Sequence, residues 1–296
     1  MPHTTHPMRG VLLVLAAVFV FACMDSTTKH LTMLYNPVVV VATRYIVNLL
    51  LLLIFFVPKQ GMALFSVQRR GLVWVRGFAL AFSSLFAALA LQTMPVAETT
   101  AIVYLAPFGV LLLSGSILGE KVRLSGWLAT ALGFMGLLLI VRPGSGLSPV
   151  GTLFALGCAA MTVIYHLLSR LLAKTESTLA MLLYAALAGA IFFCALLPWN
   201  WQIPSPESLD TGLFVMIGFM ALAGHFLFTA AYREAPASLL SPVNYVHLAW
   251  AALLGWLIFG HVPDRISMIG IGCVAAAGIG NALWNHFAQS EAPLQE

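Results

Sequence analysis

Three charged residues lie in or beside the first two apolar stretches of the chain: Asp25, Lys29 and Arg44. Asp25 and Lys29 are spaced i, i+4, so they can pair on one face of a helix. Arg44 lies two turns into its stretch, about 10 Å deep at 1.5 Å per residue. Charge inside a membrane is costly and faces a cavity or a partner. The three residues therefore suggest an outer gate or a site for a substrate carboxylate. The alternative is a structural ion pair in which Lys29 reaches the interface.

Three histidines, His166, His225 and His247, also fall within apolar stretches. Imidazole titrates near neutral pH, so one of them could carry a coupled proton. The alternative is a neutral histidine that is hydrogen-bonded in a polar cavity. His225 lies nearest the middle of its stretch and is the first candidate. No HExxH pattern or zinc-like spacing is present, so we expect neither a metal nor a cofactor.

Aromatic and polar residues gather in the segment Ser241–Trp250, where Asn244, Tyr245, His247 and Trp250 are too polar to face lipid together. Pro242 in this segment and Pro107, which follows Tyr104, free backbone carbonyls and can kink their helices. Two kinked helices are a reasonable wall for a pocket, in which aromatic rings receive apolar side chains and an ammonium group. Other candidates for the wall are Phe82, Ser83, Phe86 and Tyr165. The alternative is that these aromatic rings only fill the interior.

The elements that must position these residues are membrane-spanning helices. Of 296 residues, 61% are apolar and 8% are charged, with a mean hydropathy of +0.97, whereas soluble domains average about 25% charged residues. A net charge of +4, scattered along the chain, argues against a nucleic-acid binder. Runs of about 20 apolar residues cross a bilayer as helices. The sequence predicts ten, at about Gly10–Thr27, Pro37–Val57, Leu72–Leu91, Ala97–Leu118, Leu124–Val141, Gly151–Leu171, Thr178–Trp199, Thr211–Tyr232, Ala237–Phe259 and Ser267–Phe287.

Basic residues in the loops predict the orientation, because they concentrate on the cytoplasmic side. With the N-terminus in the cytoplasm, that side receives Arg9, Lys59, Arg69, Arg70, Arg76, Lys121, Arg123, Arg170, Lys174 and Arg233. The opposite side receives Lys29, Arg142 and Arg265. We therefore expect both termini in the cytoplasm.

An internal repeat relates the two halves of the chain at an offset of 141 residues. The matching positions are Gly10 and Gly151, Gly77-Phe78 and Gly218-Phe219, Pro95 and Pro236, Tyr104 and Tyr245, and Gly119 and Gly260. Each half, residues 1–146 and 147–296, would hold five spans. Since five is odd, the second half enters the membrane from the opposite side. Such an inverted repeat is typical of secondary transporters, with the substrate at the repeat interface.

The sequence resembles the drug/metabolite transporter superfamily, EamA-type branch, from about Gly10 to Asn285. Pro95-Val96-Ala97-Glu98 and Leu118-Gly119-Glu120 resemble the two ends of that family's fourth helix, and Arg44 matches a recurring arginine. The second half departs from the pattern, because His261 follows Gly260 where a glutamate would be usual. Within the family, the chain looks most like the inner-membrane aromatic amino acid exporters.

These patterns predict an all-helical exporter of amino acids in the bacterial inner membrane, working by alternating access and favouring aromatic and other bulky neutral cargo. The alternatives are an exporter of another metabolite or amphipathic drug with the same fold and, more distantly, an intramembrane lipid-modifying enzyme. Small residues allow helices to approach closely. They recur on the tenth span at Gly272, Ala276 and Gly280, and on the fifth at Ala129, Gly133 and Gly136. These two spans are therefore expected to form scaffold contacts or a homodimer interface.

Overall fold

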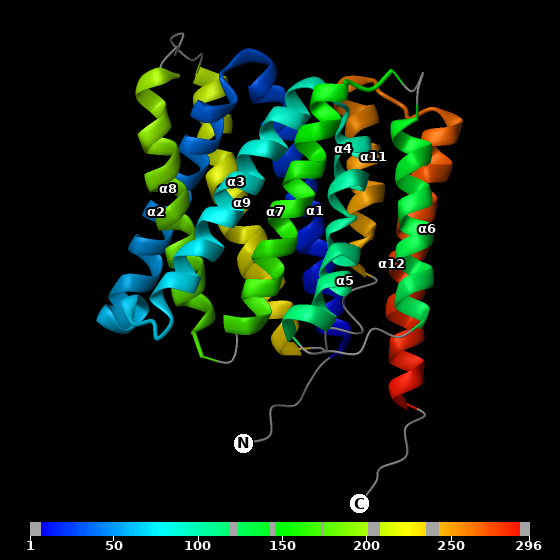
Figure 1. Ribbon diagram of the computed structural model, residues 1–296. Coiled ribbons are helices and arrows are strands. Elements are labelled where there is room, and N and C mark those ends of the chain that lie inside the picture. The colour runs from blue at the N-terminus through cyan, green and yellow to red at the C-terminus, as the bar shows by residue number, and fades with distance from the viewer. Residues whose placement is uncertain are drawn as a thin grey trace, which may run out of the picture.

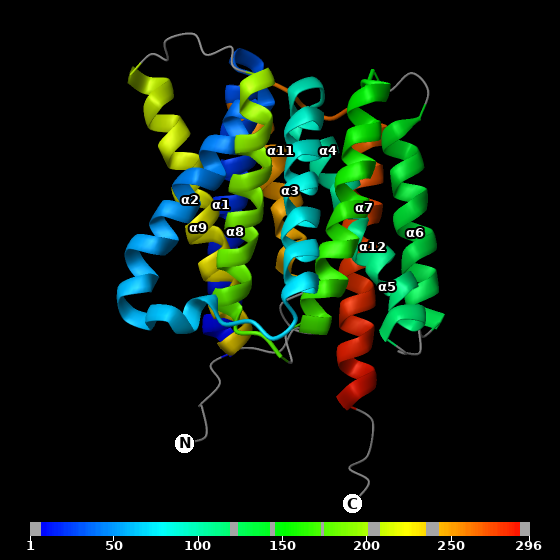
Figure 2. The ribbon, with the colours of Figure 1, turned by 60° about the vertical axis from the view of Figure 1, so that its left-hand side comes forward.

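The computed structural model describes residues 7–118, 124–142, 146–172, 175–200, 208–234 and 243–290, and it contains no strand within these ranges. The helices lie side by side as a bundle (Figures 1 and 2). They are α1 (Pro7–Leu34), α2 (Pro37–Gln60), α3 (Arg70–Thr93), α4 (Val96–Val103), α5 (Ala106–Leu118), α6 (Leu124–Val141), α7 (Pro149–Leu172), α8 (Thr178–Leu196), α9 (Ser208–Glu234), α11 (Val246–Phe259) and α12 (Arg265–Ser290), with the 3-10 turns η1 (Gly61–Phe65) and η2 (Leu197–Trp199).

Within the described residues, the predicted spans are helical apart from short interruptions in the fourth and ninth spans. Among the described residues, six helices are long and apolar enough to cross a membrane. Four shorter apolar segments lie in the remaining predicted spans: Val96–Val110, Trp127–Val141, Val246–Phe259 and Arg265–Gly280. Helices suit this composition because a backbone surrounded by lipid must satisfy its hydrogen bonds internally.

Two of the spans are interrupted at a tyrosine. The fourth span breaks at Tyr104 and Leu105, between α4 and α5. Pro107 lacks an N–H, and its ring clashes with the carbonyl four residues earlier, at Val103, where α4 ends. The predicted kink at Pro107 is therefore a break. The ninth span turns at Tyr245, just before α11; Pro242 lies outside the described residues.

Packing joins helices that are distant in sequence. The most extensive contacts are α3 with α7, α1 with α9, and α6 with α12, and further contacts join α3 with α8, α2 with α9, and α2 with α8. Glycine allows two of these approaches: a Cβ on Gly77 would lie 2.7 Å from Ala188 Cβ on α8, and one on Gly218 would overlap Val47 on α2.

The two ends of the bundle are distinct. We call the end at which α1 begins and α12 ends the terminal end, and the other, which carries the α1–α2 turn, the opposite end (Figure 1). Helix α7 begins at the opposite end, whereas α1 begins at the terminal end. At the opposite end Arg142 forms an ion pair with Asp264. The Ser267 backbone N–H and the Arg142 side chain hold the pKa of the Asp264 carboxyl below its ordinary value.

The small-residue stripes of the fifth and tenth spans lie in different environments. On α6, Ala129, Gly133 and Gly136 are buried, and a Cβ on Gly136 would lie 2.7 Å from the Gly270 carbonyl oxygen of α12. On α12, the residues Gly272, Ala276 and Gly280 are exposed. The stripe on the tenth span therefore faces away from α6, and the close approach of α12 to α6 uses Gly270 instead.

Candidate functional site

Asp25 lies in the middle of α1 and faces α11. Its Oδ2 lies 3.5 Å from Nε2 of His247, and the two side chains are 25% and 8% exposed. Arg44 of α2 interacts electrostatically with the same carboxylate. Two of the sequence-predicted candidates from separate halves of the chain, Asp25 and His247, thus meet inside the bundle.

Lys29, one turn further along α1, turns to other partners. Its ammonium group donates hydrogen bonds to the backbone oxygens of Leu91 (3.0 Å) and Met94 (2.7 Å) at the end of α3. It also lies 5.4 Å from the ring centroid of Phe259. The prediction that Asp25 and Lys29 pair with each other is therefore wrong. Lys29 binds the free carbonyls at the C-terminus of α3, which attract a cation, and Asp25 lies against His247 instead.

The two tyrosines at the helix breaks lie against each other. The rings of Tyr104 and Tyr245 are 5.3 Å apart, and the ring of Tyr104 is 5.5 Å from that of His247. The Tyr104 hydroxyl donates to the backbone oxygen of Asn244 (3.0 Å). A break in a helix frees backbone carbonyls. The carbonyl of Asn244 accepts the hydrogen bond from Tyr104, which joins the first half of the chain to the second.

Several buried polar atoms around this contact have no hydrogen-bond partner among the described residues. They include Ser26 Oγ on α1 and, in the ninth span, Asn244 Oδ1, His247 Nε2 and Trp250 Nε1. Buried polar groups are nearly always paired. These unpaired atoms lie on α1 and in the ninth span, the two elements that meet at Asp25 and His247. We call Asp25, Ser26, Asn244, His247 and Trp250 the polar seam.

His225 on α9 packs against α1 one turn before Asp25. Its ring packs edge-on against Phe21 of α1, with centroids 5.1 Å apart. Arg44, Arg76 and His166 all interact with it electrostatically. Arg44 interacts electrostatically with both Asp25 and His225.

Arg76 was predicted to lie in a cytoplasmic loop, and this prediction is wrong. Arg76 is only 4% exposed and lies inside α3. Its guanidinium donates to Ser169 Oγ (2.7 Å), Met181 O (3.0 Å) and Tyr165 Oη (2.9 Å), and it lies 4.4 Å from the Tyr165 ring centroid. Tyr165, expected in a substrate pocket, is therefore engaged by Arg76. The position of Arg76 within the predicted apolar run Leu72–Leu91 was the signal that could have found it.

The remaining aromatic candidates pack with other helices. Phe82 is 39% exposed, and its ring centroid lies 4.7 Å from Phe192, whereas that of Phe86 lies 6.1 Å from Phe154. Ser83 hydrogen-bonds Thr162 Oγ1 (2.9 Å). These contacts join α3 to α7 and α8.

A second carboxylate–histidine pair lies near the opposite end. Glu98 of α4 is 2% exposed, and its Oε1 lies 3.0 Å from His261 Nε2. Lys29 interacts electrostatically with Glu98. The sequence analysis noted Glu98 and His261 only as motif positions, and Glu120 lies outside the described residues.

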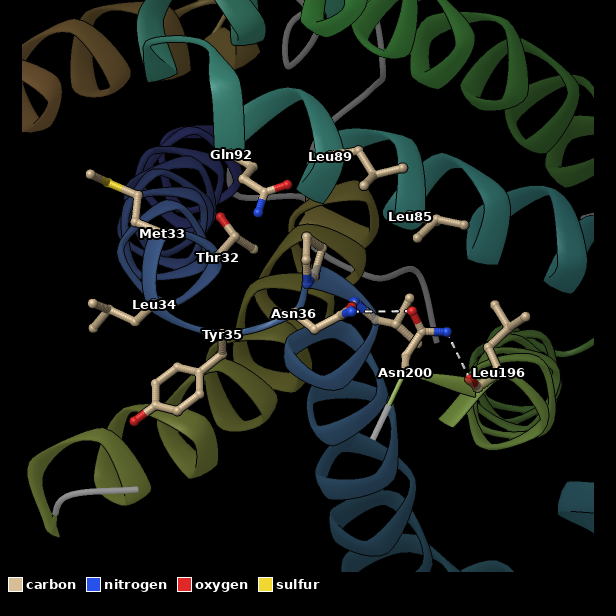
Figure 3. A pocket seen from close by; sticks show the side chains of 12 residues that line it. Thr32, Met33, Leu34, Tyr35, Asn36, Leu85, Leu89, Gln92, Leu196 and Asn200 are labelled. Atoms are coloured by element: carbon tan, nitrogen blue, oxygen red, sulfur yellow. Dashed lines mark hydrogen bonds between the residues drawn. The ribbon is translucent and has the colours of Figure 1, made fainter. Parts of the chain in front are cut away.

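A cavity of about 600 Å³ opens at the opposite end, around the α1–α2 turn. It is lined by Thr32, Met33, Leu34, Tyr35, Asn36, Pro37, Val38, Leu85, Leu89, Gln92, Leu196 and Asn200. Figure 3 shows the Asn36 amide bonded to Asn200, whose amide in turn bonds Leu196 O. None of the sequence-predicted site residues lines this cavity. Among the described residues, no group of three or more His, Cys, Asp or Glu could hold a metal ion.

Comparison with known families decides the class of protein. The model of the EamA-like transporter family matches residues 8–142 and again residues 149–281. The chain belongs to this family. The expected resemblance is thus confirmed, and the EamA-like transporter carries the family's domain twice.

Named relatives of this EamA-like transporter are transporters of different compounds. A riboflavin transporter of Vibrio cholerae is 27% identical over 87% of both chains. A pseudopaline exporter, CntI, of Pseudomonas aeruginosa is 28% identical over 90% of this chain and 95% of its own. An S-adenosylmethionine uptake transporter of Rickettsia prowazekii is 24% identical over 89% and 88%. A crystal structure with 20% identity and a TM-score of 0.65 covers 93% of this chain and 98% of its own, and it supports the fold.

The EamA-like transporter is therefore a membrane protein that moves a small molecule, and it is not an enzyme. The alternative of a lipid-modifying enzyme is set aside by its family. Its polar seam contains residues of both halves of the chain.

Proposed function

We propose that the protein exports amino acids, with aromatic and other bulky neutral ones favoured, across the bacterial inner membrane. The observation that carries the proposal is the polar seam, where one carboxylate and several unpaired buried polar atoms adjoin aromatic rings. Asp25 would hold the substrate ammonium group and Arg44 its carboxylate. Tyr104, Tyr245 and Trp250 would receive the apolar side chain, and His225 would lie beside it.

We further propose that the two halves, divided near residue 146, form an inverted repeat. Its support is the pairing of related elements across one axis. The offset of 141 residues relates α1 to α7, α2 to α8 and α3 to α9. The contact of α3 with α7 thus corresponds to the contact of α9 with α1, and the contact of α3 with α8 corresponds to that of α9 with α2. All four contacts are present. Related elements also touch one another: α2 and α8, α6 and α12, and the rings of Tyr104 and Tyr245. Alternating access would rock one set of helices against the other.

The proposed orientation places the terminal end in the cytoplasm. Arg76 is buried and does not count toward the orientation, but Arg9, Lys59, Arg69, Arg70 and Arg233 lie near helix ends at the terminal end, as membrane insertion favours. The cavity beside Asn36 would then open outward and give the cargo a route of release.

A homodimer is proposed through the fifth and tenth spans. The exposed stripe Gly272, Ala276 and Gly280 on α12 offers the small residues that such an interface needs. Cross-linking in native membranes of a cysteine placed at Gly280 would test it: a dimer band supports this surface, and monomer alone rejects it.

Counterflow tests the proposed cargo. Purified protein would be reconstituted in liposomes loaded with unlabelled phenylalanine, and entry of labelled phenylalanine would be followed. Transient accumulation above protein-free liposomes supports the proposal. We expect Tyr104→Ala, Tyr245→Ala, His225→Ala and Trp250→Ala to slow exchange severalfold, while Trp256→Ala, a 54% exposed tryptophan on the same helix, serves as the control. Wild-type rates in all four folded variants would reject the site.

The second candidate is export of another metabolite with the same fold. It is favoured by the relatives, whose names include riboflavin, pseudopaline and S-adenosylmethionine transporters at 24–28% identity. Competition in the same assay by other amino acids, riboflavin and S-adenosylmethionine separates the two. Inhibition by one of the latter two compounds, but by no amino acid, would favour the second candidate.

A further inference from the structure

Lys29 lies between the polar seam and the opposite end of the bundle. Helix α1 runs from the terminal end to the opposite end, so Lys29 is one turn, about 6 Å, further along this path than Asp25. Its ammonium group binds the Leu91 and Met94 oxygens at the C-terminus of α3 and lies over the Phe259 ring of α11. One side chain of α1 therefore contacts both α3 and α11 on the way out of the polar seam.

The Glu98–His261 pair joins two further elements next to Lys29. Glu98 belongs to α4 and His261 follows α11, and their nearest atoms are 3.0 Å apart. Helices α4 and α11 come from different halves of the chain and pack against each other. Lys29 interacts electrostatically with the Glu98 carboxylate, so the two sets of contacts are coupled. We call Lys29, Glu98 and His261 the charged cluster.

The charged cluster is only partly satisfied. Glu98 is 2% exposed, and its Oε2 is buried without a hydrogen-bond partner among the described residues. An unpaired buried oxygen costs free energy, which weakens the contact. The His261 side chain is 39% exposed, so water can replace Glu98 as its partner. A pair that is buried on one side and wet on the other is suited to break and form again.

The helices that the pair joins are also interrupted in the middle of the bundle. Helix α4 ends at Tyr104, and α11 begins after Tyr245. Each of these helices is thus the part of its span that faces the opposite end, and the interruption gives the backbone a place to bend. The Glu98–His261 pair ties α4 and α11 together at the ends furthest from these interruptions, where a small rotation gives the largest displacement.

We propose that the charged cluster is a gate that closes the route from the polar seam to the opposite end, and that it opens when His261 leaves Glu98. Lys29 keeps its bonds to the α3 carbonyls, so α1 and α3 form the side against which α4 and α11 move. Of the charged residues for which the sequence suggested an outer gate, Lys29 alone belongs to this cluster. The proposal rests on the proposed alternating access, but not on the proposed cargo.

The accessibility of a single cysteine tests the gate without any cargo. Ser26 of the polar seam is 2% exposed, and Ser26→Cys would be made in a protein whose native cysteines, Cys23, Cys158, Cys194 and Cys273, are replaced by serine. A membrane-impermeant maleimide would be added to one side of the membrane at a time. We expect Glu98→Gln and His261→Gln to speed labelling severalfold from the side of the opposite end, because a weaker pair increases the open population.

Asp264→Asn is the matched control. It removes the ion pair with Arg142, which lies at the same end but joins the ends of α6 and α12, so labelling should stay at the rate of the parent protein. Unchanged labelling in folded Glu98→Gln and His261→Gln would overturn the gate. If these variants lower the midpoint of thermal unfolding and leave labelling unchanged, the pair only stabilises the fold and the proposal is rejected.

A reversible cross-link tests the closed state. Glu98→Cys and His261→Cys, in the same cysteine-free protein, would be joined by a short bifunctional thiol reagent that contains a disulfide. We expect the cross-link to abolish phenylalanine counterflow and a reducing agent to restore it; full counterflow in the cross-linked protein would overturn the gate. If counterflow is absent from the folded parent protein while the pair variants still speed labelling, the cargo is wrong and the gate is supported.

Discussion

Arg76 shows how a charged side chain is accommodated deep in the bundle. Its guanidinium reaches three oxygens on two helices, Ser169 and Tyr165 on α7 and Met181 on α8, and it stacks on the Tyr165 ring. Arginine suits this place because its planar fork can serve several acceptors at fixed angles. The residue therefore holds the beginning of α3 to its two neighbours.

Substitution of Arg76 should destabilise the protein. Arg76→Ala removes the three hydrogen bonds that the guanidinium donates to Ser169, Met181 and Tyr165, and we expect a loss of about 2 kcal/mol in the free energy of unfolding. The midpoint of thermal unfolding in detergent measures it. Arg70→Ala, at the exposed start of the same helix, is the control and should change little. Equal midpoints for the two variants would contradict this role.

Glu176, in the turn between α7 and α8, makes stability depend on pH. Burial raises the pKa of its carboxyl, but hydrogen bonds from the backbone N–H groups of Arg69 and Gln68 outweigh this, so the pKa lies below its ordinary value. A lowered folded pKa gives stability that is full above the ordinary glutamate pKa and is lost as the pH falls through the folded value.

We expect Glu176→Gln to unfold at a lower temperature than wild type near neutral pH, and this difference to shrink on acidification below the ordinary glutamate pKa. Thermal unfolding across a pH series measures it. Glu234→Gln, which removes a carboxylate paired at 3.4 Å with the exposed Arg9, should have a smaller effect. A difference that stays constant at all pH values would contradict the linkage.

At the scale of elements, the interruptions at Tyr104 and Tyr245 matter most. They allow two helices from opposite halves to present side chains and free carbonyls to one place. Tyr245 keeps its position because α12 carries glycine at Gly278, where an added Cβ would overlap the tyrosine ring. The absence of a side chain at Gly278 therefore leaves room for Tyr245 next to the polar seam.

Two glycines half a turn apart on α12 should respond in opposite ways. Gly278→Ala forces Tyr245 to move, and we expect about 2 kcal/mol of destabilisation together with slower counterflow. Gly280→Ala meets no atom within 4 Å, and alanine favours a helix over glycine, so stability should be unchanged or increased. Thermal unfolding and counterflow measure both; equal behaviour of the two variants would refute the contact.

The elements were largely predictable from the sequence, whereas the partners of the charged residues were not. Apolar run length indicated each span, and Pro107 indicated a kink in the fourth span, where the structure has a break after Val103. Both effects are local. The i, i+4 spacing of Asp25 and Lys29 is local too, but their partners come from α3 and α11. No local pattern specifies such tertiary contacts. For Arg76, its place within the apolar run Leu72–Leu91 did indicate a position inside a span, but nothing local indicated its partners.

At the scale of the whole molecule, α1 begins and α12 ends at the same end of the bundle (Figure 1). With the orientation proposed from the basic residues, that end is cytoplasmic. A green fluorescent protein fused to the C-terminus should therefore fluoresce, and alkaline phosphatase fused there should be inactive. Alkaline phosphatase fused after Arg142 should be active, because Arg142 lies at the opposite end. The reverse pattern would invert the proposed direction.

The contact between Gly136 and Gly270 brings the backbones of α6 and α12 together with no side chain between them. Such a pair has little room to slide, so the distance between α6 and α12 should stay constant and can serve as a reference. Spin labels on the outer faces of α6 and α12 should report one fixed separation under all conditions. Labels that join either helix to α1 or α3 would then reveal which parts of the molecule move when cargo is added.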